Sequence, residues 1–353
     1  MNDVIEQWQE KVRSAAAEGM SLRPRGGGTK DFFGRRADGE VLYTRALSGI
    51  VSYEPTELVV TVRAGTPLAE LESMLAERGQ RLPFEPPHFG DSATVGGCVA
   101  SGLSGPSRLA VGALRDFVLG VKIIDGRGDL LAFGGQVMKN VAGYDVSRLF
   151  AGSLGTLGLL CEISLKVLPR PAVERTLCLG MGPADAVEHL NQWGGQPLPI
   201  SASSWHEGEL RLRLSGAEAA VAAAVARIGG EEVDAVDAQA WWRALREQRL
   251  AFFAEGDLPL WRLAVPSTTA PMAGDWFIEW GGGQRWLRSD ASAEEIRRIA
   301  SGVGGHATLF RGGDRDGEVF QPLAAPLMMI QRRLKQAFDP AGVFSPGRLY
   351  NGF

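Results

Sequence analysis

Three glycine-rich stretches in the first half of the chain have residue types that could bind an anion. The first is Pro-Arg-Gly-Gly-Gly-Thr-Lys at 24–30, the second spans 90–105, and the third places glycines at 152–158 with two residues between them. Runs of glycine allow positive φ angles and bring backbone N–H groups close to a ligand. A single loop of this kind could be a structural turn. Three of them, each beside an expected strand, favour one extended, doubly charged ligand.

The standard single-loop nucleotide motifs do not account for these glycines. The dipeptide Gly-Lys never occurs, so the chain has no Walker loop for a triphosphate. A Gly-x-Gly-x-x-Ala sequence does occur at 302–307, but it follows an expected helix and lacks a βαβ unit. The sequence therefore disfavours both ATP hydrolysis and a Rossmann-type dinucleotide site.

Few residues are candidates for catalysis. The chain has four histidines, at 88, 189, 206 and 306, and they are far apart in sequence. A base that removes a hydroxyl proton near neutral pH is normally a histidine or a perturbed carboxylate or tyrosine. The segment 304–318 offers His306, Arg311 and Asp314, although a surface or packing role is the commoner use of such a histidine. We assign no catalytic residue.

The composition excludes several classes of partner. The net charge is −4 and no Lys/Arg-rich run occurs, so we expect no binding to nucleic acid or to an anionic membrane surface. No stretch approaches the ~20 consecutive apolar residues of a membrane span. Residues 1–19 have an amphipathic helical pattern rather than that of a signal peptide, which predicts a cytoplasmic protein. Cys98, Cys161 and Cys178 form no Cys-x-x-Cys pair, so an iron–sulfur cluster would belong to another chain.

Local patterns predict the elements around the glycine stretches. Residues 57–65 form a β-branched run that predicts a buried strand. A helix follows in which Thr66 can cap, Pro67 fits the first helical position and Gly79 ends the element. Residues 83–112, rich in glycine and proline, predict a long functional loop. Beyond it we expect two strands joined at Asp-Gly-Arg-Gly-Asp, a short helix, and a strand that ends at Pro169.

Residues 172–310 have a different character. A β-like alternation at 203–214 precedes an alanine-rich helix at 217–228 and a helical stretch around two adjacent tryptophans. A hairpin at 276–288, a helix at 292–300 and a strand at 306–311 follow. This order favours a split β-α-β arrangement of ferredoxin-like form. The tail predicts one more helix, with an apolar stripe that includes Leu327 and Ile330, ended by Asp339-Pro340.

Five segments, taken in order, carry a resemblance to a known family: 24–30, 92–106, 115–128, 139–158 and 338–349. They resemble the FAD-binding domain of the vanillyl-alcohol oxidase type, also called the PCMH type. The resemblance covers residues 22–169 and about the last twenty. It implies an α+β fold with a two-subdomain FAD-binding domain at 1–170, a reduced ferredoxin-like cap at 171–311, and a C-terminal segment, 312–353, that returns to the FAD domain.

The resemblance also implies the residues that bind FAD. In the family the flavin lies between two α+β subdomains, amides of the first two loops hold the pyrophosphate, and the third loop lies near the adenosine. By position, these residues are Arg25, Gly26, Gly27, Gly28 and Thr29, then Thr94, Gly96, Gly97, Ser101, Gly102 and Gly105, then Gly152, Thr156, Gly158 and Ile163. We add Arg348 as a side chain that could position an anionic group. No metal site is implied.

Two departures from the family pattern bear on the cofactor. Relatives that attach flavin covalently carry a histidine where this chain has Thr29, so we expect non-covalent FAD unless His88 or Cys98 takes that part. The third loop reads Gly-Ser-Leu-Gly where most members have Gly-Ser-Glu-Gly, so Leu154 replaces a carboxylate. The sequence offers no account of what this second change does.

Within the family, the short length, the reduced cap and the ending resemble best the second flavin-domain subunit of bacterial glycolate oxidases. That resemblance implies a complex with a larger homologous flavoprotein subunit, which oxidises the small 2-hydroxy acid to its oxo acid, here glycolate to glyoxylate, and an iron–sulfur subunit that takes the electrons. The chain would then be cytoplasmic and reach a membrane only through these partners. Two alternatives stay open: a self-sufficient flavin dehydrogenase of a small hydroxy acid, and a non-catalytic FAD-binding scaffold.

Overall fold

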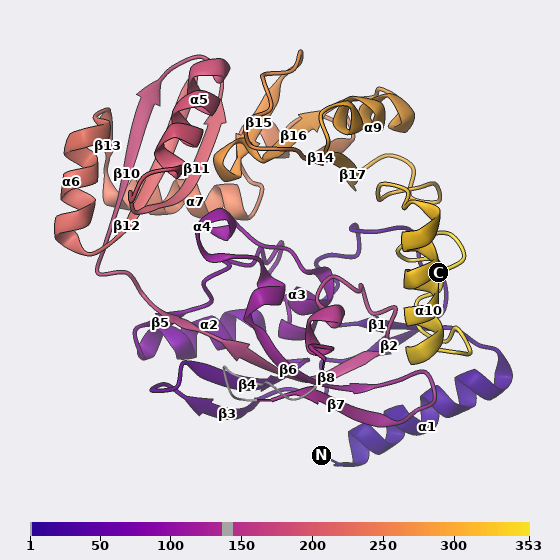
Figure 1. Ribbon diagram of the computed structural model, residues 1–353. Helices are drawn as coiled ribbons and strands as arrows, with labels where there is room; N and C mark the ends of the chain where they lie inside the picture. The colour runs from indigo at the N-terminus through magenta and orange to yellow at the C-terminus, as the bar shows by residue number, and fades with distance from the viewer. Residues whose placement is uncertain (1, 136–143) are drawn as a thin grey trace.

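The structure is a computed structural model that describes residues 2–135 and 144–353. The protein has two layers, each built of sheet and helices (Figure 1). The first layer contains a five-stranded antiparallel sheet. Its strands, in spatial order, are β3 (Ile50–Glu54), β4 (Val59–Arg63), β8 (Leu159–Lys166), β6 (Val118–Ile124) and β7 (Leu130–Gly134). The expected strand at 57–65 and the expected hairpin of β6 and β7 are both present.

Helices α2 (Leu68–Glu77) and α3 (Val95–Ser101) pack against this sheet. The apolar side chains of α2 recur at helical spacing, and Leu68, Leu71 and Leu75 are fully buried. Burial of each such leucine stabilises the fold by roughly 1.5–3 kcal/mol. The two helices share one core with the sheet, which holds the loops between them in place.

The first glycine stretch begins at the end of β1 (Leu22–Arg25). This strand forms a small parallel pair with β2 (Glu40–Tyr43). Helix α1 (Asn2–Glu18) packs beside this pair. The C-terminal tail returns here, because the Leu22 N–H donates to the Val343 carbonyl at 2.7 Å and the Ser345 N–H donates to the Leu22 carbonyl at 2.9 Å. The tail therefore meets the N-terminal part of the chain at the start of the first glycine loop.

Helix α10 (Ala325–Phe338) leads into that tail and is fixed by one buried lysine. Lys335 Nζ donates to Asp339 Oδ2 at 2.7 Å, to the Thr156 carbonyl at 2.7 Å and to the Phe344 carbonyl at 2.8 Å. Asp339 in turn accepts from the N–H groups of Val343 and Phe344. One side chain thus ties the third glycine loop to the returning tail.

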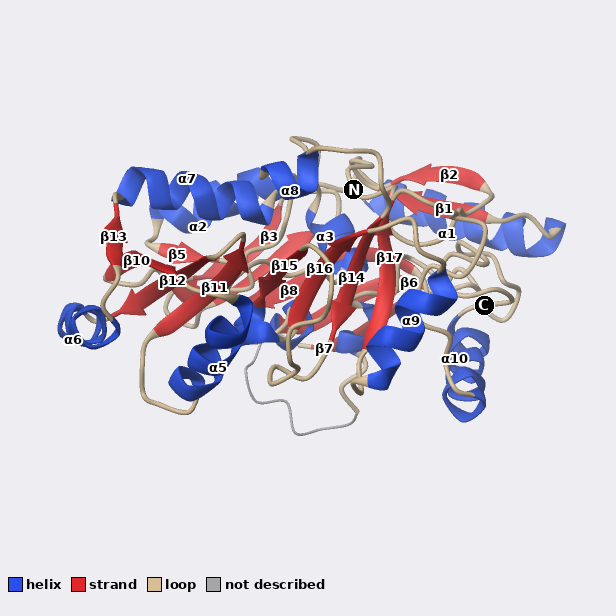
Figure 2. Cartoon of the chain, turned by 90° about the horizontal axis from the view of Figure 1, so that it is seen from above, coloured by secondary structure: helices blue, strands red, loops and turns tan. Residues whose placement is uncertain are grey.

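The second layer is an eight-stranded sheet, seen from above in Figure 2. Its strands, in spatial order, are β13 (Glu231–Val233), β10 (Val173–Gly180), β12 (Glu209–Gly216), β11 (Ile200–His206), β15 (Trp276–Glu279), β16 (Gln284–Arg288), β14 (Leu260–Ala264) and β17 (His306–Arg311). Helices α5 (Pro183–Gly194), α6 (Glu218–Ile228) and α9 (Ala293–Gly302) connect some of these strands.

This sheet is made of two ferredoxin-like units joined edge to edge. In each unit the four strands lie in the order fourth, first, third, second, and the join is the short pairing of β11 with β15 at Ser204↔Glu279 and Trp205↔Ile278. The first unit has both connecting helices, whereas the second, which lies wholly within the described residues, has only α9. The sequence pattern suggested one such unit, and the second is the finding that the structure adds.

The two faces of the second unit differ because side chains alternate along each strand. Trp261, Leu263 and Ile278 pack under α9. The opposite face meets the first layer, and there Phe310 of β17 packs against Phe33 with ring centroids 5.2 Å apart. An aromatic cluster therefore joins the two layers.

Two local predictions were wrong. The segment 83–112 is not loop throughout, because it contains α3 and the short helix α4 (Arg108–Val111). Thr66 does not cap α2: its hydroxyl accepts from the Gly49 N–H at 2.9 Å, and Pro67 occupies the N-cap position. In both cases a contact with a distant segment outweighs the local pattern.

The remaining elements are short or lie at the edge of the layers: β5 (Gln80–Arg81), β9 (Leu168–Pro169), α7 (Ala235–Arg246), α8 (Ala251–Ala254), η1 (Leu114–Phe117), η2 (Ser147–Phe150) and η3 (Trp280–Gly282). Residues 139–143, the start of the fourth motif, lie outside the described residues. Within the described ranges, no helix has the length and apolar character that a membrane crossing requires.

Candidate functional site

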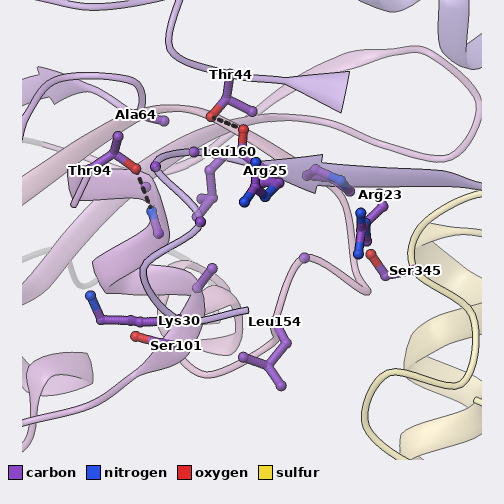
Figure 3. Close-up of a pocket in the computed structure, with 18 of the residues that line it drawn as sticks. Arg23, Arg25, Lys30, Thr44, Ala64, Thr94, Ser101, Leu154, Leu160 and Ser345 are labelled. Carbon is purple, nitrogen blue, oxygen red and sulfur yellow. Dashed lines mark hydrogen bonds between the residues drawn. The ribbon is translucent and has the colours of Figure 1, made fainter. Parts of the chain in front are cut away.

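The three glycine stretches meet at one cavity of about 110 Å³ (Figure 3). Its walls come from the end of β1, the loop that follows it, the first turn of α3, the third glycine loop and the C-terminal tail. These segments lie far apart in the sequence. The cavity exists because the tail pairs with β1 and because α3 packs on the five-stranded sheet.

Glycine is required where the first loop passes the second. A Cβ atom on Gly26 would lie 2.2 Å from Thr94 Oγ1, and one on Gly27 would lie 1.6 Å from the Ser92 carbonyl oxygen. Both distances are shorter than any tolerable contact. Gly28 has a φ of +74°, in the left-handed region that favours glycine. The three consecutive glycines therefore let the loop lie directly on the residues before α3.

The free backbone donors of the cavity lie in the first loop. The N–H groups of Gly27, Gly28 and Thr29 donate no hydrogen bond to the described part of the chain. At the start of α3, by contrast, the Gly96 N–H donates to the Ala64 carbonyl at 2.7 Å and the Gly97 N–H to Thr94 Oγ1 at 3.2 Å. The first loop, more than the helix start, can offer amides to an anion.

Basic side chains outnumber acidic ones around the cavity. The charged residues that line it are Arg23, Arg25, Lys30, Asp31 and Arg348. Asp31 Oδ2 accepts from Arg25 Nε at 2.6 Å, which leaves a net positive charge on the rest. Arg23 Nε is buried without a hydrogen-bond partner in the described ranges, and Figure 3 shows this side chain beside Ser345. A buried, unpaired guanidinium nitrogen is costly unless a ligand accepts from it, so the donor set suits a diphosphate.

Lys30 is the basic residue next to the loop. Its Nζ donates to the His88 carbonyl at 3.1 Å and lies 5.7 Å from the centre of the Phe89 ring. Burial lowers the pKa of Lys30 from its usual value. The ammonium group is thus held against the second loop, at the wall of the cavity.

Arg348 lines the cavity but has a structural role in it. Its guanidinium donates to the carbonyl oxygens of Asp31, Phe33 and Arg35. Burial lowers the pKa of Arg348 as well. These bonds from Nη1 and Nη2 hold the segment after the first loop. The suggestion that Arg348 positions an anionic group stays a prediction.

Eleven of the sixteen predicted binding residues line this cavity: Arg25, Gly26, Gly27, Gly28, Thr29, Thr94, Gly96, Gly97, Ser101, Gly158 and Arg348. Among the other five, Gly102 packs on Gly152, since a Cβ on it would lie 2.8 Å from Gly152 Cα. Gly105 packs on Glu85 in the same way. Thr156 is buried and donates to the Ser153 carbonyl, and Ile163 belongs to the sheet core.

The sequence missed several residues of the cavity wall: Arg23, Pro24, Lys30, Asp31, Thr44, Ala64, Ala100, Leu154, Gly155, Leu159, Leu160 and Ser345. Arg23 precedes the first glycine stretch and Lys30 is its last residue, so their charge was a usable signal. Ala64 and Ser345 had none, because only sheet packing and the return of the tail bring them there.

Neither alternative attachment residue lines the cavity. His88 Nε2 lies 2.9 Å from Glu72 Oε2, so this ring is already paired. Cys98 is buried in the core of the first layer, and burial raises the pKa of its thiol to about 12. At the Thr29 position the chain has a hydroxyl, which can only hydrogen-bond.

The suggested catalytic residues do not converge. His306 and Arg311 are the first and last residues of β17, which puts their Cα atoms roughly 16 Å apart. Asp314 is exposed and its carboxylate accepts from the Asp316 N–H. In residues 2–135 and 144–353 no group of three or more histidine, cysteine, aspartate or glutamate side chains could hold a metal ion.

Comparison with known proteins gives this geometry a context. A family model described as "FAD binding domain" matches residues 3–134. The chain is 50% identical over 346 residues to the glycolate oxidase subunit GlcE of Escherichia coli (strain K12), covering 97% of this chain and 96% of that protein. It is 34% identical over 160 residues to the glycolate oxidase subunit GlcD of Bacillus subtilis (strain 168), covering 45% of this chain and 34% of that protein.

A solved structure supports the fold independently. An alkyldihydroxyacetonephosphate synthase superposes with a TM-score of 0.68 at 15% identity, covering 97% of this chain and 75% of that one. At that identity the likeness concerns the fold alone. With the family match, it confirms the expected α+β FAD-binding fold. The family match and the GlcE relative confirm FAD as the cofactor.

Proposed function

This chain belongs to the family of glycolate oxidase subunit GlcE, and from that we propose that it is the FAD-binding subunit of a glycolate (2-hydroxy-acid) oxidase complex. The observation that carries the proposal is the cavity where the first glycine loop, the start of α3 and the returning tail meet. Its unpaired loop amides and its excess of basic side chains suit the pyrophosphate of FAD.

Within the cavity, we propose that the amides of Gly27, Gly28 and Thr29 and the side chain of Arg23 bind the pyrophosphate. The hydroxyls of Thr29 and Thr94 add neutral donors, whereas the Ser101 hydroxyl donates to the Cys98 carbonyl, and Gly155 and Gly158 border the end of the cavity formed by the third loop. The chemistry that FAD supplies when bound is the ability to accept a pair of electrons. The loops supply position and exclude water, and we propose that FAD is held without a covalent bond.

We propose that the chain acts with two partners: a larger homologous flavoprotein subunit and an iron–sulfur subunit that takes the electrons. A relative is itself named a second subunit of glycolate oxidase, GlcD, which supports the multi-subunit arrangement. Helix α10 supports it too, because Leu327, Met329 and Ile330 are 54%, 48% and 57% exposed. Adjacent exposed apolar side chains of this kind are typical of surfaces that bind another protein.

The division of labour and the location are also proposals. We propose that residues 1–170 and 312–353 hold FAD, that residues 171–311 cover it, and that the complex works at the cytoplasmic side of a membrane through its partners. The alternatives are a self-sufficient dehydrogenase and a non-catalytic FAD-binding scaffold.

Purification of the full chain alone, and again with its co-expressed partners, tests the proposal. We expect the isolated chain to be yellow and not to be bleached by glycolate, and the complex to be bleached. Bleaching of the isolated chain by glycolate would support the self-sufficient enzyme. A folded, colourless chain that does not take up added FAD would contradict the proposal.

A further inference from the structure

A larger cavity of about 480 Å³ lies between the two layers, on the side of the molecule where α7 is placed above α2 and β5 (Figure 1). Residues of α2, β5 and the segment after β9 line it from the first layer, and residues of α7, β10 and β12 line it from the second. It shares no lining residue with the first cavity, that of the glycine loops. We call it the arginine cleft, because its lining includes Arg81, Arg170, Arg213, Arg243 and Arg246.

Two local features of the fold bring these arginines to one place. On α7, the cleft residues Trp242, Arg243 and Arg246 recur at helical spacing, so they share one face of the helix. In the first layer, β5 pairs with β9, and the Arg170 N–H donates to the Gly79 carbonyl at 2.8 Å. This bond sets Arg170 beside the start of β5. Basic residues of both layers therefore border the same space.

Two of the three carboxylates in the cleft are taken up by Arg213 and Arg81. Glu85 Oε1 lies 2.8 Å from Arg213 Nη2 and 3.5 Å from Arg81 Nη1. Glu174 Oε2 lies 3.8 Å from Arg213 Nε and accepts a hydrogen bond from Ser215 Oγ at 2.8 Å. Neither carboxylate is left over for a further arginine.

The third carboxylate, that of Glu72, is shared in the same way. Its Oε2 lies 2.9 Å from His88 Nε2, and its Oε1 lies 3.7 Å from Arg246 Nη1. Arg246 has a second acceptor, because its Nε donates to Glu247 Oε1 at 2.8 Å. The acidic residues of the cleft thus serve three of its five arginines.

The other guanidinium donors of the cleft have no acceptor. In the described part of the chain, the side chains of Arg170 and Arg243 form no hydrogen bond and no ion pair. Arg81 Nε is buried and has no hydrogen-bond partner there either. A buried donor without an acceptor destabilises the fold unless a ligand supplies one. Five arginines against three glutamates also leave the cleft positive, which attracts anions.

We propose that the arginine cleft binds a small phosphate-bearing anion, a phosphate monoester or inorganic diphosphate, with Arg81 and Arg170 on one side of it and Arg243 on the other. Guanidinium groups bind phosphate oxygens through paired N–H donors. A phosphate monoester carries about −1.5 to −2 charges at pH 7, which matches the excess of arginine over glutamate. The site is additional to the proposed flavin site and does not depend on it.

The lining of the cleft limits the rest of the ligand. Its apolar side chains are Leu82 and Trp242, so it offers little contact to an apolar group. Trp242 is only 4% exposed, and the Arg213 guanidinium lies over its ring at 5.2 Å from the centre. This ring is therefore not free to stack on a nucleobase. We expect a phosphate without an aromatic base.

An anion in this position would be held by both layers at once. Arg81 and Arg170 belong to the first layer, whereas Arg243 belongs to α7 of the second. A ligand that binds the folded chain alone raises its melting temperature as the ligand concentration rises. We therefore expect the anion to stabilise the contact between the layers.

Calorimetric titration of the FAD-loaded full chain with sodium diphosphate tests the inference, in magnesium-free buffer at constant ionic strength. Loading with FAD fills the first cavity, so that cavity does not contribute to the signal. We expect saturable binding of one diphosphate per chain and a rise in melting temperature. The double variant R170Q/R243Q should bind diphosphate roughly 10- to 100-fold more weakly, the usual effect of losing hydrogen bonds to a charged group.

The matched control is R227Q. Arg227 is exposed in the last turn of α6, as Arg243 is in the last turn of α7, but it lines neither cavity. R227Q should bind diphosphate as the unaltered chain does. FAD content is measured on the same samples, and R170Q/R243Q should retain its FAD because neither arginine lines the first cavity.

Three outcomes would overturn the inference. The first is equal affinity of R170Q/R243Q and the unaltered chain for diphosphate. The second is an equal loss of affinity in R227Q, which would mean general attraction of anions to a basic surface. The third is binding of diphosphate no tighter than that of chloride. Adenosine diphosphate should bind no more tightly than diphosphate, and tighter binding would contradict a site without a place for a base.

Discussion

The carbonyl oxygen of Ser92 lies where a side chain on Gly27 would begin, 1.6 Å from the position of a Cβ atom on that glycine. Ser92 Oγ also donates a hydrogen bond to the Gly27 carbonyl at 2.9 Å. The first glycine loop therefore lies in direct contact with the segment before α3. The amides that we assign to the pyrophosphate depend on this contact.

Replacing Gly27 by valine should abolish FAD retention. The valine Cβ would have to displace the Ser92 backbone, which moves the free amides of the first loop away from the cavity. The ratio of flavin to protein absorbance after gel filtration measures the effect, and the eight-stranded sheet should stay folded. Gly194→Val is the matched control, because nothing lies within 4 Å of a Cβ at that position. Full retention of FAD by G27V would refute the loop assignment.

Acid precipitation should release all of the flavin into the supernatant. Thr29 has no nucleophilic nitrogen, His88 is paired with Glu72, and burial raises the pKa of Cys98 to about 12. Absorbance of the supernatant and the pellet after trichloroacetic acid treatment measures the partition. Yellow colour that stays in the pellet would mean a covalent link, and H88Q and C98A would then locate it.

Substitution of Glu85 by glutamine should weaken the contact between the layers. Glu85 Oε1 lies 2.8 Å from the guanidinium of Arg213, and both side chains are largely buried. Breaking a buried pair from one side costs roughly 3–5 kcal/mol of unfolding free energy. Denaturant unfolding at pH 7 measures this loss. Glu40→Gln is the control, because the exposed pair of Glu40 with Lys11 should contribute less than about 1 kcal/mol.

The contribution of Glu85 should depend on pH in one direction. Burial opposes the charged form, but Arg213 and Arg81 together lower the pKa of Glu85 below its ordinary value of 4.5. A depressed carboxyl pKa stabilises the fold above the unfolded pKa and loses that effect as the pH falls through the folded pKa. The stability gap between the unaltered chain and E85Q should thus be constant above about pH 5 and shrink below pH 4.5. A gap that widens on acidification would contradict this.

Lys335→Met should both destabilise the fold and weaken FAD binding. The lysine holds the Thr156 and Phe344 carbonyls and the buried Asp339 carboxylate, which would be left without its charged partner. We expect a loss of roughly 3–5 kcal/mol, seen as a lower melting temperature, and faster FAD dissociation because Ser345 and Arg348 line the first cavity. Arg333→Met, at an exposed position of the same helix, is the control and should change neither.

Much of the fold follows from short-range pattern. Leucines at helical spacing predict helix α2. Two apolar runs around a glycine-rich turn predict the β6–β7 hairpin. The pattern failed where distant segments compete: Thr66 bonds to Gly49 instead of capping, and α3 forms because its start pairs with Ala64 and Thr66. The doubling of the ferredoxin-like unit was not predictable from local pattern, because it rests on the two residue pairs that join β11 to β15.

The sequence by itself determined the glycine loops, since only residues without a Cβ can lie as close as Gly27 does to Ser92 and only glycine adopts positive φ freely. Its three cysteines, which form no Cys-x-x-Cys pair, also led to the prediction that an iron–sulfur cluster would belong to another chain. Tertiary structure alone decided that Arg23 lines the first cavity with a buried, unpaired nitrogen, while the Nη atoms of Arg348 donate to three backbone carbonyls. It alone decided that Arg81, Arg170 and Arg243 line one cleft between the layers. The physical reason is range: backbone preference acts within a few residues, whereas pairing and desolvation of charges depend on strand register and on segments hundreds of residues apart.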